Sequence, residues 1–181
     1  MKGLKSFAFF ACASAALALT GCAASVKSGG TQTLVIQDTA KKNLIVTLEG
    51  NNKVQQNEDW QRLKQEWNEA LLVEASRAGF NVAGDKTSLR DDSDAVCVKI
   101  NVTNFRYLTP GARYSAGVMV GNAWINSSAE YSYLRSQKLI GTRTYDTSSS
   151  AWEGVMSAMT KEQAEAISQK IISDIKTARS N

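Results

Sequence analysis

The sequence predicts an α+β domain in which an antiparallel sheet of about four to six strands carries two helices packed on one face. Apolar residues recur at helical spacing over residues 57–79 and 160–178, which predicts the two helices. Apolar and polar residues alternate strictly over residues 96–103, which predicts a strand with one buried face. Two β-rich runs at residues 123–134 and 139–145, joined by a polar turn, predict a hairpin.

The first helix has an apolar stripe that repeats every three or four residues, made by Trp60, Leu63, Trp67, Leu71 and Ala75. Asn57 is its expected cap and Gly79 its expected end. The last helix has the corresponding stripe Ala164, Ile167, Ile171, Ile175 and Ala178. Capping-box signals at residues 150–153 and 160–163 predict that this helix starts near the first and continues after a break at the second.

Short β-branched runs supply the remaining predicted strands. Residues 34–36 and 44–48 predict two strands at the start of the domain, and residues 80–83 predict a further short one. Residues 84–94 are polar and predict a turn before the long alternating strand.

The amino-terminal end predicts a secretion signal. Lys2 and Lys5 precede a nearly unbroken apolar run over residues 7–19, which is the layout of a signal peptide. The run is shorter than the roughly 20 residues that a membrane-spanning helix needs. We therefore expect residues 1–21 to be removed.

The expected cleavage site resembles a lipobox, the motif that lipoprotein signal peptidase recognises. Its residues are Leu19, Thr20, Gly21 and Cys22. The resemblance implies cleavage between Gly21 and Cys22 and a covalent lipid on the Cys22 thiol, with no other cofactor. An acyl chain contributes about 0.8 kcal/mol per buried methylene, so two or three chains hold a protein firmly. The alternative is an ordinary signal with a chance cysteine.

The same resemblance implies a location. In lipoproteins of Gram-negative bacteria, Asp after the lipidated cysteine retains the protein at the inner membrane, and Ala23 stands here. This favours the outer membrane, with the domain facing the periplasm. Residues 22–31 are rich in Ser, Gly and Ala and predict a lipidated flexible tether, so residues 32–181 form the single domain.

Composition excludes several classes of function. The chain has no histidine, which excludes His-ligated metal sites and Ser-His-Asp or Cys-His catalysis. Loss of Lys2 and Lys5 with the signal lowers the formal charge from +4 to +2, which is too little for a nucleic-acid footprint. With Cys22 lipidated, Cys97 has no partner for an internal disulfide.

Acidic residues supply two weak candidates for chemistry. Asp91, Asp92 and Asp94 cluster the oxygen ligands that calcium prefers, but the segment lacks the glycine and distal glutamate of a calcium loop. We interpret it as a solvated turn and predict no metal site. Paired carboxylates also serve in glycoside hydrolysis when a cleft holds them at a set separation, and no residue is singled out as catalytic.

The aromatic residues have two interpretations each. Trp60 and Trp67 lie seven residues apart on the apolar helix face, where core packing is favoured over stacking on sugar rings. The hairpin aromatics Trp124, Tyr131, Tyr133 and Tyr145 predict cross-strand packing, with a recognition surface as the alternative. Cys97, two residues from Lys99 on the more polar strand face, is interpreted as inert, with a reactive thiol as the alternative.

A glycine-containing apolar segment is the predicted partner contact. It comprises Gly117, Val118, Met119, Val120 and Gly121. Glycine in a strand permits close backbone approach, and exposed apolar surface often marks a contact site. An internal bulged strand is the alternative interpretation. The segment is no phosphate loop, because no Lys-Ser or Lys-Thr follows it.

From about Asp59 onward, the order of elements resembles an uncharacterised family of small proteobacterial outer-membrane lipoproteins. The resemblance rests on the first helix, the Ala-Gly-Phe turn after it, the strand beginning at Asp94, the Gly/Ala-rich middle, the hairpin and the Ala/Ile-rich last helix. The sequence departs from the family in its hairpin turn at residues 135–138, which lacks the usual Asp-x-x-x-Gly. The resemblance implies the cellular location and the fold, and it implies no site residue.

The sequence therefore predicts a non-enzymatic, membrane-anchored lipoprotein that serves as a binding or assembly component of the bacterial cell envelope. Its expected partners are the membrane, through the lipid, and another envelope protein. Two alternatives stay open. One is a carboxylate-dependent hydrolase of cell-wall glycan, and the other is an accessory subunit of a secretion or surface-assembly machine.

Overall fold

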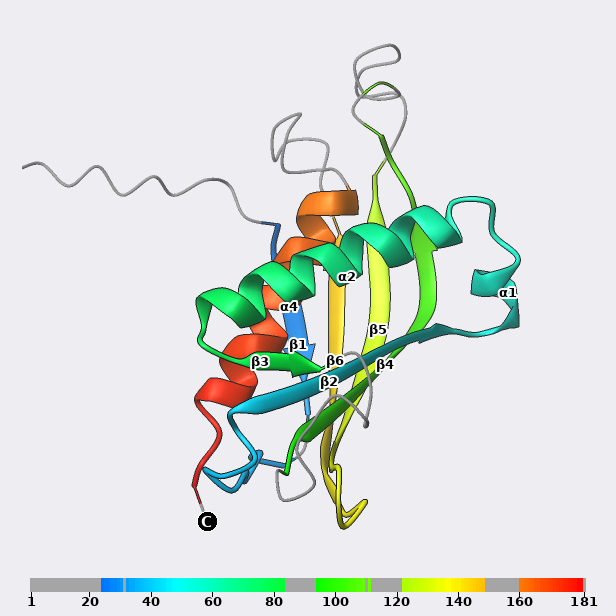
Figure 1. The fold of residues 1–181 in the computed structure, drawn as a ribbon. Coiled ribbons are helices and arrows are strands. Elements are labelled where there is room, and N and C mark those ends of the chain that lie inside the picture. The colour runs from blue at the N-terminus through cyan, green and yellow to red at the C-terminus, as the bar shows by residue number, and fades with distance from the viewer. Residues whose placement is uncertain are drawn as a thin grey trace, which may run out of the picture.

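The computed structural model describes residues 24–30, 32–83, 94–109, 111, 122–148 and 160–180. Its six-stranded sheet has the order β1-β6-β5-β4-β2-β3, and the two long helices lie over the same face of this sheet (Figure 1). The predicted two-layer α+β architecture is confirmed in this respect. No helix of the described residues is long and apolar enough to cross a membrane.

The strands and helices have the following bounds. The strands are β1 (Val26–Gly29), β2 (Asn43–Gly50), β3 (Asn81–Ala83), β4 (Val96–Arg106), β5 (Trp124–Tyr133) and β6 (Leu139–Ser148). The helices are α1 (Asn52–Gln55), α2 (Trp60–Arg77) and α4 (Thr160–Lys176). The short helix α1 was not predicted from the sequence.

The sheet is mixed, so the prediction of an antiparallel sheet is wrong for one half of it. Strands β1, β6, β5 and β4 pair antiparallel, but β2 pairs parallel with both β3 and β4. For the pair of β2 and β3, the physical reason is the connection through α2. A helix between two strands carries the chain back to its starting end, so the following strand runs parallel to the first.

Part of the predicted flexible tether is a strand. Residues Val26 to Gly29 pair antiparallel with β6, from Val26 opposite Thr147 to Gly29 opposite Thr144. Backbone pairing with a long neighbouring strand thus fixes a segment whose composition is typical of a linker. The domain begins within the range that was assigned to the tether.

The predicted strand at residues 34–36 is a single β-bridge instead. Val35 bridges Arg179 in parallel orientation, with Ile36 N donating to Arg179 O at 2.9 Å and Arg179 N donating to Leu34 O at 3.1 Å. Leu34 and Ile36 are buried and Val35 is exposed, so the segment has one buried side. It packs against the end of the chain rather than inside the sheet.

The predicted end of α2 is found in the structure, but its predicted cap is not. Gly79 follows the helix with φ of 83°, and it forms a Schellman motif in which Gly79 N donates to Ser76 O and Phe80 N donates to Ala75 O. The predicted helix end is therefore confirmed. At the start, Asn57 is not the cap, because its Oδ1 accepts from Asp59 N at 2.9 Å and the helix begins at Trp60.

The core lies between the sheet and the two long helices. Both predicted helical stripes are buried along their full length, as are the four apolar residues of the alternating strand β4, Val96, Val98, Ile100 and Val102. The predicted hairpin of β5 and β6 is also confirmed. In its turn, Gln137 has φ of 55° and its N donates to Tyr133 O at 2.9 Å.

Candidate binding surfaces

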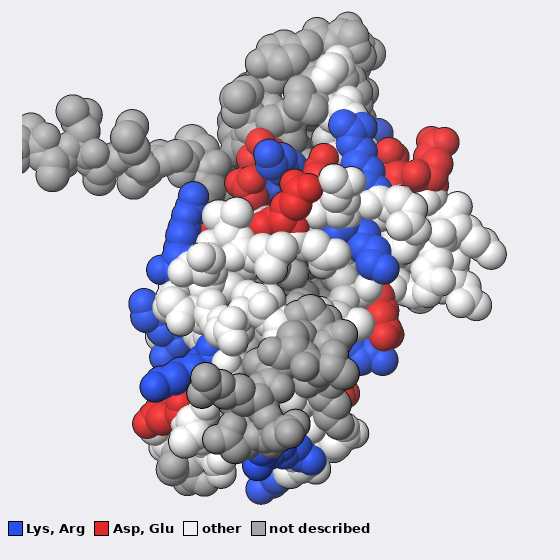
Figure 2. Space-filling model, viewed as in Figure 1, with Lys and Arg blue, Asp and Glu red and all other residues white. Residues whose placement is uncertain are grey.

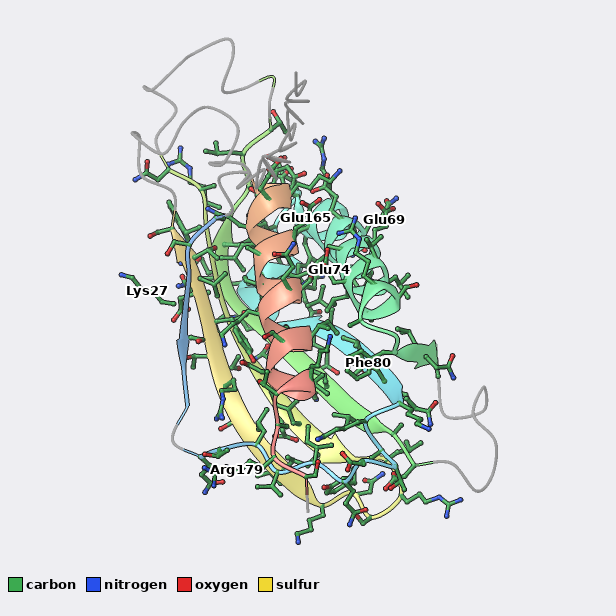
Figure 3. The ribbon with its side chains drawn as sticks, turned by 90° about the vertical axis from the view of Figure 1, so that its left-hand side faces the viewer. Lys27, Glu69, Glu74, Phe80, Glu165 and Arg179 are labelled. Atoms are coloured by element: carbon green, nitrogen blue, oxygen red, sulfur yellow. The ribbon has the colours of Figure 1, made fainter. Side chains whose placement is uncertain are left out.

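The sheet face that the helices leave uncovered, called the open face below, carries mostly small polar side chains. Seen from the side, the helices stand on one side of the sheet and Lys27 projects on the other (Figure 3). The central members of the open face, all at least partly exposed, are Thr47, Glu49, Cys97, Lys99, Asn101, Asn126, Ser128, Glu130, Ser132, Thr142, Thr144 and Asp146. They alternate with the buried residues, as in a sheet with one solvated face.

The open face has few charges, and two of these neutralise each other. Lys99 Nζ lies 3.0 Å from Glu49 Oε2 on the neighbouring strand, with the two side chains 57% and 47% exposed. Such an exposed pair contributes about 0–1 kcal/mol to stability. The surface therefore presents mainly hydroxyl and amide groups to a partner.

A shallow pocket of about 420 Å³ lies beside β1 at one end of the open face. It is lined by Ser25, Lys27, Asn126, Asp146, Thr147 and Ser148. Asn126 Nδ2 donates to Asp146 Oδ1 at 3.0 Å, and Lys27 stands opposite Asp146 in the strand register. The pocket thus has both donors and acceptors, held by three neighbouring strands.

Trp124 and Arg106 are neighbours at this same end of the sheet. The two residues are paired in the register of β4 and β5. The guanidinium carbon of Arg106 lies 5.6 Å from the centroid of the Trp124 ring, within the range of a cation–π interaction. Trp124 is thus the one hairpin aromatic of the predicted set that lies on the open face, whereas Tyr131, Tyr133 and Tyr145 are buried, as the packing interpretation predicts.

The second candidate surface is a groove of about 220 Å³ between α2 and α4. It is lined by Glu66, Glu69, Ala70, Val73, Glu74, Arg77, Lys161, Glu165 and Gln169. Figure 3 shows Glu69 and Glu74 of α2 on the side of Glu165 of α4, and acidic side chains gather on this part of the helix surface in Figure 2. Four of the lining residues are glutamates, two are basic and two are apolar.

Tyr107 fixes one glutamate at the end of the groove. Its hydroxyl lies 2.6 Å from both Oε1 and Oε2 of Glu66, and the guanidinium of Arg62 lies 5.1 Å from the centre of its ring. Burial and the hydrogen bond to Glu66 raise the pKa of the Tyr107 hydroxyl above its ordinary value. Tyr107 therefore remains a donor near neutral pH and holds the Glu66 carboxylate in place.

Glu162 is a neighbouring carboxyl with an unusual environment. Burial, with a smaller contribution from the nearby Glu165, raises the pKa of its carboxyl. Its Oε2 is buried and has no hydrogen-bond partner in the described part of the chain. The protonated form of Glu162 is therefore favoured relative to a carboxyl in water.

Several residues singled out in the sequence lie outside the described residues. These are the cleavage and lipidation positions Gly21 and Cys22, the predicted contact segment Gly117, Val118, Met119, Val120 and Gly121, and the acidic residues Asp91 and Asp92. Asp94 is described, and its Oδ1 accepts from Ala95 N at 2.9 Å and from Arg135 N at 3.3 Å. In the described ranges, no group of three or more metal-ligating side chains is assembled.

The core interpretation of the helix tryptophans is confirmed, because Trp60 and Trp67 are 4% and 0% exposed. Cys97 lies half-buried on the open face, on the strand side that the sequence predicts. The groove between α2 and α4 was not predicted. The sequence feature that could have indicated the groove is the series of glutamates beside each apolar stripe. Whether the glutamates of the two helices lie close together depends on how the helices pack.

Comparison with known proteins gives no family for this chain. No family model matches it, and no curated protein matches it. Among solved structures, it is similar to the PelC dodecamer from Paraburkholderia phytofirmans, with 14% identity, a TM-score of 0.49, and coverage of 86% of this chain and 98% of that chain. It is also similar to a Xanthomonas campestris protein assigned to DUF330, with 11% identity, a TM-score of 0.45, and coverage of 79% and 90%.

Proposed function

We propose that this chain is a non-enzymatic lipoprotein of the bacterial outer membrane that faces the periplasm and binds another envelope component through its open face. The lipobox-like residues before Cys22 support the anchor. The open face supports the binding role, since the residues of four long neighbouring strands on this face are at least partly exposed and no helix of the described residues covers them.

The chemistry of the open face suits a protein or glycan partner. Short side chains such as Ser128 and Thr142 lose little conformational entropy when a partner covers them. Their hydroxyls accept and donate hydrogen bonds, so a polar partner can satisfy them. The predicted contact segment at residues 117–121 precedes β5 in the sequence and lies outside the described residues, so it stays a separate prediction.

The anchor is tested by metabolic labelling with palmitate. The full-length chain should incorporate label and yield a mature product whose first residue is lipidated Cys22. The Cys22→Ser variant should incorporate none and should accumulate as precursor or be released. Label in this variant, or a mature product that starts elsewhere, contradicts the proposal.

The binding surface is tested by site-specific photocrosslinking in intact envelopes. A photoreactive residue at Ser128 or Thr142 should give one defined adduct, whereas one at the exposed Leu72 of α2 should give none. Identification of the adduct also tests the role in a secretion or surface-assembly machine, which predicts a subunit of such a machine. Adducts from Leu72 alone would contradict binding through the open face.

The acidic groove favours one second candidate, a carboxylate-dependent hydrolase of cell-wall glycan. Glu69 and Glu165 are the carboxylates that would act, since Tyr107 already holds Glu66 and Arg77 forms an ion pair with Glu74 at 2.7 Å. Glu165→Gln and Glu69→Gln would then abolish glycan turnover by purified protein. Turnover that both variants retain, or its absence from the unaltered protein, removes this candidate.

A further inference from the structure

The strand register places four residues in a row at one end of the sheet. Val26, Thr147, Ile125 and Phe105 pair in succession across β1, β6, β5 and β4. One position beyond them, Trp124 pairs with both Ser148 and Arg106, and Ser25 directly precedes β1. The residues Ser25, Ser148, Trp124 and Arg106 are called the end row below.

The end row lies close to the proposed lipid. Cys22 precedes Ser25 by three residues, which span at most about 11 Å when fully extended. Neighbouring strands are about 4.8 Å apart, so Arg106, three strands from β1, lies about 14 Å from Ser25 along the row. Every residue of the end row therefore lies within about 25 Å of Cys22, where the proposed lipid enters the bilayer.

The opposite end of the sheet is much farther from the anchor. Strand β6 runs for 10 residues from Ser148 back to Leu139, which is about 33 Å at the usual rise per residue. The turn with Ser136 lies beyond it. A flexible tether over residues 22–31 would have allowed either end to turn toward the bilayer, but the pairing of β1 with β6 removes most of that freedom.

Side chains at the end row have the chemistry of a membrane interface. Trp124 is partly exposed beneath the guanidinium of Arg106, which is itself exposed. Tryptophan is enriched at the level of lipid headgroups, and cations close to the surface are attracted to anionic lipids. Lys27, two residues inside the row on β1, adds a second exposed cation at this end.

We propose that the domain stands end-on on the bilayer, with the end of the sheet that carries the end row toward the phospholipid headgroups and the strands directed away from the membrane. This orientation rests on the proposed lipid anchor and extends it. It leaves the open face upright and accessible from the side. It also carries the turn that contains Ser136 away from the membrane, together with the cation Arg179, which Figure 3 shows at the lower end of the molecule.

The competing arrangement is a domain that lies flat on the bilayer. Exposed cations at the far end, including Arg135, Lys138 and Arg179, would favour contact of that end with anionic lipid. In such an arrangement both ends of β6 approach the headgroups equally. The two arrangements therefore differ in the distance between the far turn and the membrane.

The test uses the full mature, lipidated chain in vesicles of phosphatidylethanolamine and phosphatidylglycerol. In a Cys97→Ser background, Ser148→Cys, Thr144→Cys and Ser136→Cys each carry a bimane label. All three positions are exposed and represent the near end, the middle and the far turn. Headgroup-spin-labelled lipid then quenches fluorescence according to proximity, and the mass of the amino-terminal peptide reports lipidation of Cys22.

The proposal predicts quenching that falls from position 148 through 144 to 136, with at least a threefold difference between the two ends. Equal quenching at 148 and 136 would overturn it in favour of the flat arrangement. Absence of quenching at all three positions of a lipidated, vesicle-bound protein would also overturn it, because the domain would then be held away from the bilayer surface. An unmodified Cys22 would overturn the anchor itself, and the mass measurement distinguishes that result from the others.

Discussion

The hydroxyl of Tyr145 on β6 donates a 2.7 Å hydrogen bond to Oδ2 of Asp174 on α4. Because its single proton is used there, the 2.5 Å contact with the hydroxyl of Tyr131 is one in which Tyr131 donates. Lys170 Nζ lies 2.6 Å from the other carboxylate oxygen of Asp174. This chain of contacts joins two strands to the last helix through two buried tyrosine hydroxyls and the partly exposed Asp174 and Lys170.

Among these contacts, removal of the Tyr145 hydroxyl should lower the stability of the fold most. Tyr145→Phe leaves the Tyr131 hydroxyl without its acceptor and removes the donor to Oδ2 of Asp174, which keeps Lys170 at its other oxygen. We therefore expect a loss of about 1–3 kcal/mol in unfolding free energy. Tyr131→Phe removes only the outer donor and should cost about 0.5–1.5 kcal/mol. Urea unfolding of both variants measures the difference, and a larger loss for Tyr131→Phe would contradict the direction of the chain.

The same tyrosines should set the alkaline limit of stability. Burial raises the pKa of both Tyr131 and Tyr145 above the ordinary value. In the unfolded chain each loses its proton near pH 10, whereas in the folded state each stays protonated. Their contribution is therefore complete below about pH 10 and is lost as the pH rises further.

We accordingly expect the melting temperature to stay nearly constant from pH 8 to about pH 10 and to fall above it. The fall should be less steep in Tyr131→Phe, which removes one titrating group. Thermal unfolding followed by circular dichroism at each pH gives the profile. An identical slope in the variant would mean that other groups cause the alkaline loss.

Two leucines on α2 offer a matched test of the helix packing. Leu63 is 0% exposed and Leu72 is 51% exposed, although both belong to the same helix. Leu63→Ala should lower the unfolding free energy by about 2–5 kcal/mol, since it leaves a cavity. Leu72→Ala should change it by no more than about 0.5 kcal/mol. Similar losses at both positions in chemical denaturation would place α2 in a different rotation about its axis.

Periodicity predicted the parts of the fold that bury apolar side chains. Leu63 and Ile167 recur in stripes that only a helix aligns, and Val98 lies in an alternation that only a strand aligns, so both signals are local. Strand β1 has no such signal, because Val26 is half-buried and the rest of the strand is exposed. Its order comes from backbone pairing with β6, and the sequence of the strand alone does not reveal that partner.

The parallel half of the sheet and the acidic groove were missed for a related reason. Both depend on how α2 packs: it carries the chain from β2 to β3, and it aligns Glu69 with Glu165 of α4. The apolar spacing shows which side of a helix is buried, but not which neighbour covers it. The helix-borne carboxylates therefore became a candidate site only in the folded structure.

Replacement of Glu162 by glutamine should stabilise the protein at neutral pH. Burial raises the pKa of this carboxyl, with Glu165 contributing through repulsion, so the charged form is disfavoured in the folded state. The ionised Glu162 lowers the unfolding free energy. This loss is absent below the pKa of about 4.5 that the carboxyl has in the unfolded chain, and it grows as the pH rises through the higher pKa of the folded state. Glu162→Gln removes that charge at every pH.

The unfolding free energy of Glu162→Gln should therefore exceed that of the unaltered protein at pH 7, and the difference should shrink toward pH 4. The exposed Glu58 provides the control, since Glu58→Gln removes the same charge from a solvated position before α2 and should leave stability unchanged. Urea titrations at both pH values compare the three proteins. An equal gain in both variants would trace the effect to net charge, whereas a gain confined to Glu162→Gln assigns it to the burial of this carboxyl beside the groove.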